Sequence, residues 1–322
     1  MKDTDYAFCV ARIRANESNL LSAEFIKKLV DAESYEAAVR LLETVGWIDG
    51  DTEDGDFIRR QNRNLWKLLS ESVPDKKVLD YLCVLNDYFN IKTAIKCVLS
   101  GENADKYYVE PSSLPLESLC SSIDGRAFDV LKSKSMRSAA KNAFETACMT
   151  NRGQDAEMLL DVAALEALLE IYSDCKYRVF REICAFIVDS SNIRTAIRCA
   201  ANKKDATFIS SALSDCCKIK KDKLISEAVS GVDGLREHLA SGVYAEGTEL
   251  YYTNSALYDN WCEKRVLEIA TGSGFTAFGF DPVCAYFYKK NNEIKTVKLI
   301  LNAKKSGIPT ELLKERVMVT YA

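Results

Sequence analysis

Apolar residues recur at helical spacing along almost the whole chain, and very little of it alternates with the period of a β-strand. The run from Tyr6 to Leu21 carries an apolar stripe, and Ser22 and Ser34 stand where a serine caps the next short helices. Gly46 is expected to end the third run, and another helix is expected over about 57–70. The pattern therefore predicts an all-α fold.

One helical motif occurs three times. Residues 90–97 read Asn-Ile-Lys-Thr-Ala-Ile-Lys-Cys, and residues 192–199 read Asn-Ile-Arg-Thr-Ala-Ile-Arg-Cys. A third, weaker copy has Ile294, Lys295 and Thr296 in register, but Lys298 stands where the first two copies have isoleucine. The copies lie 102 and 101 residues apart, which indicates an internal triplication.

The triplication predicts three similar helical domains, which we place at 1–110, 111–218 and 219–322. A Ser-, Pro- and Leu-rich stretch between Glu110 and Glu117 is the clearest linker. Repeats of 34 residues, as in tetratricopeptide solenoids, are disfavoured because a step of that length from Ile91 reaches Gly125, where the motif is absent.

The third copy lies in a stretch from Phe280 to Arg316 that has the pattern of three helical runs. Asp281 and Pro282 predict a helix start, and Gly307 predicts the end of a later run before Pro309 and Thr310 begin the last. The pair 291–292, two asparagines, predicts a break in between. The stretch is thus expected to form a helical hairpin with a polar hinge.

Charge and composition exclude several classes of function. The 43 basic and 47 acidic residues give a formal charge of −4, which is too balanced for a nucleic-acid-binding surface. The lysine clusters at 203–204, 218–223, 289–290 and 304–305 are interpreted as solvated helix faces or ends. The acidic stretch 49–56 lacks the glutamate that a calcium loop needs at its end.

The twelve cysteines are scattered, and no two have the C-x-x-C spacing of a redox or zinc motif. Most occupy apolar helical positions, such as Cys83, Cys97, Cys184 and Cys199, where cysteine acts as a small hydrophobe. This usage predicts a reducing, cytosolic setting. The first residues show no signal-peptide core and no apolar run reaches about 18 residues, so a soluble protein is expected.

Residues that could carry chemistry are few. The single histidine, His238, rules out a site with two histidine ligands and is interpreted as an ordinary helix residue. The glycine-rich stretch 272–279 matches neither phosphate-binding motif and is interpreted as a spacer. The aromatic runs 107–108, 251–252 and 286–288 are interpreted as core or boundary residues. We predict no catalytic, cofactor-binding or metal-binding residue.

Two stretches resemble the terminal signatures of the C subunit of the V-type and archaeal-type (A-type) rotary ATPases, a family related to the d subunit of the eukaryotic V-ATPase. The first stretch runs from Tyr6 to Leu21 and includes the motif residues Arg12, Arg14 and Glu17. The second runs over 278–311, through Phe-Gly-Phe-Asp-Pro, Glu-Ile-Lys and Gly-Ile. The resemblance covers essentially the whole chain and departs at the asparagine pair 291–292, where an acidic approach to the glutamate is more common.

The resemblance implies a funnel-shaped, all-helical protein with three similar domains about a pseudo-threefold axis. It implies a peripheral position on the cytoplasmic side of the membrane, joining the D and F subunits of the central stalk to the ring of membrane proteolipids. It implies no catalytic residues and no bound nucleotide, and we expect neither a cofactor nor a nucleic-acid partner. The expected function is torque transmission that couples ATP hydrolysis or synthesis to proton or sodium transport. Which ion and which direction depend on other subunits.

Two alternatives stay open. A general helical-repeat scaffold for other proteins would show the same triplication without affinity for stalk subunits. A thiol-based redox enzyme is suggested by the cysteine count alone, and it would need at least one exposed cysteine with a low pKa.

Overall fold

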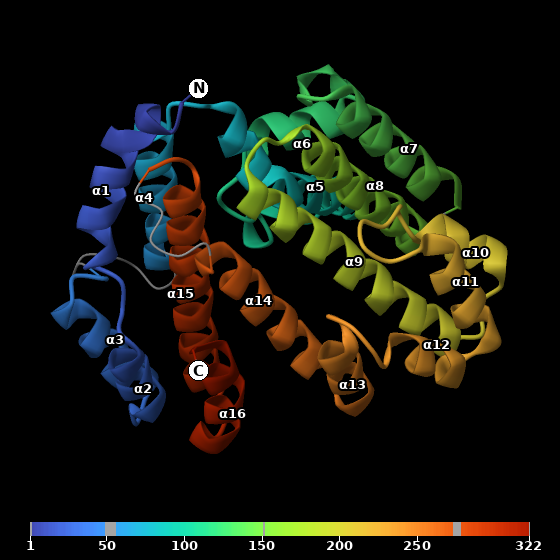
Figure 1. Ribbon diagram of the computed structural model, residues 1–322. Coiled ribbons are helices and arrows are strands. Elements are labelled where there is room, and N and C mark those ends of the chain that lie inside the picture. The colour runs from blue at the N-terminus through green and yellow to red at the C-terminus, as the bar shows by residue number, and fades with distance from the viewer. Residues whose placement is uncertain (1, 49–55, 151, 273–277, 322) are drawn as a thin grey trace. The chain divides into compact units, whose positions relative to one another are not determined.

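The computed structural model describes residues 2–48, 56–150, 152–272 and 278–321, and within these ranges it contains helices and turns but no strand (Figure 1). The predicted all-α fold is confirmed. The contacts divide the chain into two compact units, residues 1–76 with 254–322, and residues 77–253. The domain boundaries drawn from the triplication stay a prediction. None of the described helices is both long and apolar enough to cross a bilayer.

The first unit brings the beginning and the end of the chain together (Figure 1). Its helices are η1 (Asp3–Tyr6), α1 (Ala7–Glu17), α2 (Ala23–Asp31), α3 (Tyr35–Thr44), α4 (Asp56–Ser72), α14 (Ser255–Thr271), α15 (Asp281–Lys305) and α16 (Thr310–Tyr321). The hydroxyls of Ser22 and Ser34 accept hydrogen bonds from Phe25 N at 3.2 Å and Ala37 N at 3.1 Å, so both predicted caps are confirmed.

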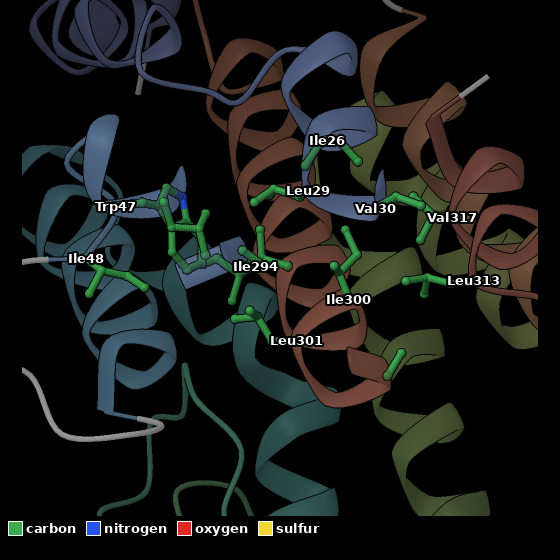
Figure 2. Packing of buried hydrophobic residues seen from close by; sticks show 14 of the residues in the cluster. Ile26, Leu29, Val30, Trp47, Ile48, Ile294, Ile300, Leu301, Leu313 and Val317 are labelled. Atoms are coloured by element: carbon green, nitrogen blue, oxygen red, sulfur yellow. The ribbon is translucent and has the colours of Figure 1, made fainter. Parts of the chain in front are cut away.

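The core of this unit forms where α2, α3 and α16 pack around α15 (Figure 2). Ile294 and Ile300 of α15 meet Ile26 and Leu29 of α2, and Trp47 covers the cluster from the segment after α3. Buried aliphatic area of this kind stabilises by about 25 cal/mol per Å². The apolar spacing of the third motif copy therefore holds the first and last segments together.

Gly279 explains part of the C-terminal signature. Its φ is +94°, in the region that favours glycine, and a Cβ atom placed there would lie 3.2 Å from Oδ1 of Asp3. Directly after it, Phe280 packs edge-on against Tyr6 with ring centroids 6.3 Å apart. The glycine thus lets the start of α15 approach the N-terminal segment closely.

The predicted break at residues 291–292 is wrong, because α15 runs without interruption from Asp281 to Lys305. The asparagines are half-buried within it, and packing on both sides outweighs their weak preference against helix. The predicted start at Asp281 and the end before Gly307, whose φ is +66°, are confirmed. Asp281 is the first helical residue and not its cap.

The second unit is a helical bundle in which α8 packs against α5, α7 and α9. Its helices are α5 (Lys77–Ser100), η2 (Ala104–Lys106), α6 (Leu116–Asp124), η3 (Phe128–Val130), α7 (Lys134–Thr150), α8 (Gly153–Asp174), α9 (Arg178–Ala201), α10 (Ala206–Ala212), α11 (Lys221–Ser230), α12 (Val232–Leu239) and α13 (Ala245–Thr253). Tyr81 of α5 stacks on Phe180 of α9 with ring centroids 6.0 Å apart.

The three motif copies lie in the three longest helices described, α5, α9 and α15, and each buries the first isoleucine of the motif. These residues are Ile91, Ile193 and Ile294. Lys298 is exposed on α15, whereas isoleucines 95 and 197 at the equivalent positions are buried. The weaker third copy thus reflects one helix face that is covered in the first two copies and faces solvent in the third.

Candidate functional site

Among the buried polar residues of each of the three long helices are two, three positions apart, that we call a clamp pair. The pairs are Asp87 and Asn90 on α5, Asp189 and Asn192 on α9, and Lys290 and Glu293 on α15. Residues three positions apart lie on one face of a helix, so both members can reach the same neighbouring segment. All six side chains belong to residues less than a tenth exposed, so each needs hydrogen-bond partners.

The first clamp pair binds the segment before α6. Asp87 Oδ1 accepts hydrogen bonds from Ser112 Oγ at 2.6 Å and Ser113 N at 2.8 Å. Asn90 forms two bonds of 2.9 Å with the backbone of Val109, donating to its carbonyl and accepting from its N–H. The Ser- and Pro-rich stretch predicted as a linker is therefore bound to α5.

The second clamp pair binds the segment before α11 in the same way. Asp189 accepts from the backbone N–H groups of Cys217 at 2.7 Å and Lys218 at 2.8 Å. Asn192 accepts from Ser214 N at 3.2 Å and donates to Ser214 Oγ at 3.1 Å. A carboxylate and an amide at equivalent positions thus hold equivalent loops in the first two copies.

The third clamp pair has different chemistry and binds the start of the chain. Glu293 Oε2 accepts from Leu21 N at 2.6 Å, and its Oε1 accepts from Trp47 Nε1 at 2.9 Å and Lys290 Nζ at 2.6 Å. The ammonium also lies 5.4 Å from the centre of the Trp47 ring. The loop that Glu293 holds precedes α2. The last copy of the motif is therefore bound to the first segment of the chain.

The two buried aspartates have altered acidity. Burial raises the pKa of Asp87, while hydrogen bonds from Ser112 and Ser113 act in the opposite direction. Burial likewise raises the pKa of Asp189, against hydrogen bonds from its loop and from Tyr244, whose hydroxyl lies 3.0 Å away. Each carboxyl is thus a structural acceptor held in place by several donors.

A polar cavity of about 500 Å³ opens beside the third clamp pair. Amides and hydroxyls line it, together with apolar and aromatic side chains that include Trp47 and Tyr286. Lys290 is the one charged residue among the described residues that line it. A second cavity, of about 550 Å³, lies between α5 and α8. The polar lining residues of the first cavity are Asn16, Ser18, Asn19, Ser22, Gln61 and Asn64.

The interpretation of the last two lysine clusters as solvated faces is wrong at two residues. Lys290 is buried, and Lys304 donates to the carbonyl oxygen of Val30 at 2.9 Å. Desolvation lowers the pKa of Lys304. Both lysines lie on α15, whose packing against the N-terminal helices covers them.

Other predicted features are placed as follows. His238 is a half-buried residue of α12, as predicted. Tyr286 and Phe287 are buried as predicted, whereas Tyr107 is half exposed at the rim of the second cavity. The acidic stretch 49–56 and the glycine-rich stretch 272–279 lie mostly outside the described residues.

The clamp pairs were not predicted from the sequence, although a signal is present. The repeated motif begins at Asn90 and Asn192, and extending it three residues upstream adds Asp87 and Asp189. In the third copy the same positions hold a lysine and a glutamate, which share no residue type with the others. Only the structure shows that the third pair also binds a loop, the one before α2.

Every thiol for which a pKa shift is resolved has a raised pKa, which is the opposite of what a catalytic nucleophile needs. All twelve cysteines lie in the described ranges and none of them forms a disulfide; seven are buried, and Cys148 is the exposed one. Burial raises the pKa of Cys216 to about 11 and that of Cys217 to about 12. A thiolate at neutral pH is therefore disfavoured at both.

We expect iodoacetamide at pH 8 to alkylate Cys148 first and Cys216 and Cys217 far more slowly. Because the thiolate reacts, the rate at Cys216 should rise about tenfold per pH unit up to its pKa. Mass spectrometry of tryptic peptides at successive times and pH values measures this. Rapid alkylation of Cys216 at neutral pH would contradict the prediction and favour the thiol-enzyme alternative.

Binding of loops to helices is the chemistry that the described residues support. Among them no three His, Cys, Asp or Glu side chains are grouped so that they could hold a metal ion. Three acceptor-bearing pairs fix the chain segments before α2, α6 and α11. The third clamp pair differs from the other two, and its buried Lys290 lines a polar cavity.

Comparison with known proteins identifies the family. The profile of the ATP synthase (C/AC39) subunit family matches residues 9–316. The C subunit of the V-type sodium ATPase of Enterococcus hirae is 23% identical over 324 residues, which cover 96% of this chain and 97% of that protein. The C subunit of the A-type ATP synthase of Methanocaldococcus jannaschii is 26% identical over 343 residues, 96% of this chain and 85% of that protein. The chain belongs to the C subunits of the V-type and A-type rotary ATPases.

Proposed function

We propose that this chain is the non-catalytic connector of the central stalk in a V/A-type rotary ATPase. It binds the D and F subunits of the rotor on one side and the ring of membrane proteolipids on the other, at the cytoplasmic face of the membrane. It transmits torque and so couples ATP hydrolysis or synthesis to proton or sodium transport. The observation that carries the proposal is the family match over residues 9–316, which includes most of both terminal signatures.

The clamp pairs support a mechanical role. A connector under torque must keep its segments fixed against one another, and buried polar side chains that hydrogen-bond to another segment favour one specific arrangement of a packed core. Clamp pairs at equivalent positions bind the loops before α6, α11 and α2, and the last copy is bound to the first segment. This order supports the proposal of three similar domains in a pseudo-threefold arrangement.

The contact with the proteolipid ring is proposed to be polar and charge-assisted. None of the described helices is long and apolar enough to cross the bilayer, and exposed charges are frequent on the described surface. Attraction between exposed charges is screened beyond about 10 Å at 0.1 M salt. The affinity should therefore fall as salt is added.

The test uses the purified chain, a D–F stalk complex and proteolipid rings in lipid nanodiscs. We expect binding to both partners, with the ring complex released as sodium chloride rises from about 0.05 to 0.5 M. Ring binding that does not change with salt would contradict the charge-assisted contact. Absence of binding to D–F and to the ring would contradict the connector role and favour the general scaffold, which needs neither partner.

A further inference from the structure

We propose that the polar cavity beside the third clamp pair binds an acidic loop of a partner polypeptide, with Lys290 as the residue that recognises the carboxylate. The inference goes beyond the connector role, because it assigns a ligand to a cavity of the first unit. About 500 Å³ is within the common range of ligand sites, roughly 300–1,000 Å³.

The first step is the unused hydrogen-bonding capacity of Lys290. A lysine ammonium has three N–H donors. Among the described residues, Nζ of Lys290 has one hydrogen-bond acceptor, Oε1 of Glu293 at 2.6 Å. The side chain is about nine-tenths buried and lines the cavity. The remaining donors can therefore serve a group that enters the cavity.

The second step is that Glu293 already has its own partners. It accepts from Leu21 N, Trp47 Nε1 and Lys290 Nζ, so its negative charge is shared among three donors. A second carboxylate would therefore be held by the remaining N–H donors of Lys290, beside an ion pair whose two charges already offset each other. Hydrogen bonds between an ammonium and a carboxylate are roughly twice as strong as those between neutral groups.

The third step identifies the occupant as a polypeptide loop. At the positions equivalent to 290, Asp87 and Asp189 each bind the N–H groups of a chain loop. In the third copy the loop before α2 is held by Glu293, and Lys290 holds no loop group among the described residues. A lysine in place of an aspartate reverses the polarity of the hydrogen bond. A loop bound there must therefore offer acceptors, and a carboxylate is the strongest.

The rest of the lining fits the backbone of such a loop. Side-chain amides both donate and accept hydrogen bonds, which matches the N–H and C=O groups of a peptide. Asn64 and Gln61 lie one turn apart on α4, and Asn16 and Asn19 lie at the end of α1. One N–H of Gln61 already donates to Trp47 O and one of Asn16 to Arg12 O, which leaves their second N–H and their oxygens for a ligand. A carboxylate at Lys290 with peptide groups along these amides would use both features of the cavity.

The test is a titration of the full chain with acetyl-Gly-Asp-Gly-amide, followed by NMR at the indole N–H of Trp47, a lining residue whose N–H donates to Glu293 in the adjoining clamp pair. The chain has three tryptophans, so the indole signals can be assigned by substitution. We expect a saturable shift of the Trp47 signal. The peptide with Asn in place of Asp should bind about tenfold more weakly, since a charge-assisted bond is lost.

Variants separate recognition from folding. Lys290→Arg keeps the cation and should retain the preference for Asp, whereas Lys290→Gln should abolish it. Asn64→Phe should block the cavity without touching the clamp pair, and Asn302→Phe, at an exposed position of α15, is its matched control. Equal binding of both peptides, or binding unchanged by Lys290→Gln, would overturn the proposal.

Sodium acetate distinguishes an anion site from a peptide site. We expect acetate to shift the Trp47 signal much more weakly than the peptide, because it lacks the backbone groups that the amides would bind. Equal affinity for acetate would overturn the assignment of a polypeptide ligand. A Trp47 signal that no probe shifts would overturn the site itself.

Discussion

Replacing Glu293 by alanine is expected to destabilise the first unit by about 3–5 kcal/mol, because it leaves the buried ammonium of Lys290 without its counter-charge. The substitution also removes the acceptor of Leu21 N and of Trp47 Nε1. All three tryptophans belong to this unit, so tryptophan fluorescence during urea unfolding reports its stability.

A matched control lies in the same unit. Glu263 pairs with Lys295 at 3.2 Å, but both side chains are about half exposed. Such a surface pair contributes about 0–1 kcal/mol, so Glu263→Ala should change the unfolding midpoint little. If Glu293→Ala and Glu263→Ala lowered the unfolding midpoint equally, the third clamp pair would stabilise the first unit no more than a surface ion pair does.

Replacing Asp189 by alanine is expected to cost the second unit about 3 kcal/mol, because each buried donor left without an acceptor costs roughly 1–3 kcal/mol. The affected donors are the N–H groups of Cys217 and Lys218 and the hydroxyl of Tyr244. Hydrogen–deuterium exchange gives the direct readout. The amides of Cys217 and Lys218 should exchange much faster in the variant than in the wild type.

Two tyrosine variants test how much of this stability comes from a single donor to Asp189. Tyr244→Phe removes one of the three donors of Asp189 and should cost about 1–2 kcal/mol. Tyr252→Phe removes a weaker, partly exposed bond of 3.3 Å to Val232 O and should cost less. Unchanged exchange at Cys217 and Lys218 in the Asp189 variant would mean that the loop is held by other contacts.

The loss of stability caused by Asp189→Ala should depend on pH. Burial raises the pKa of Asp189 in the folded state above its value of about 3.9 in the unfolded chain. A raised pKa contributes stability that is present below the unfolded value and is lost as pH rises through the folded value. The loss of stability caused by Asp189→Ala should therefore be larger in mildly acidic buffer than at neutral pH.

Local rules account for much of what could be predicted from the sequence. Serine caps at Ser22 and Ser34 depend on hydrogen bonds within one helical turn, so the sequence could place them. The end of α15 before Gly307 depends on the backbone conformation of one residue. The predicted break at residues 291–292 failed because a local preference of a few tenths of a kcal/mol was weighed without the packing of both helix faces.

The sequence by itself determined the all-α fold, the triplication at steps of 102 and 101 residues and the family signatures, because each is written in spacing along the chain. Only the tertiary structure decided that Lys290 is buried beside Glu293, and that Glu293 holds Leu21 and Trp47 from the other end of the sequence. Hydrogen bonds between segments about 250 residues apart depend on where the chain brings them. The spacing of residues along the chain does not encode such a contact, so only the three-dimensional structure shows the cavity and the buried Lys290 that lines it.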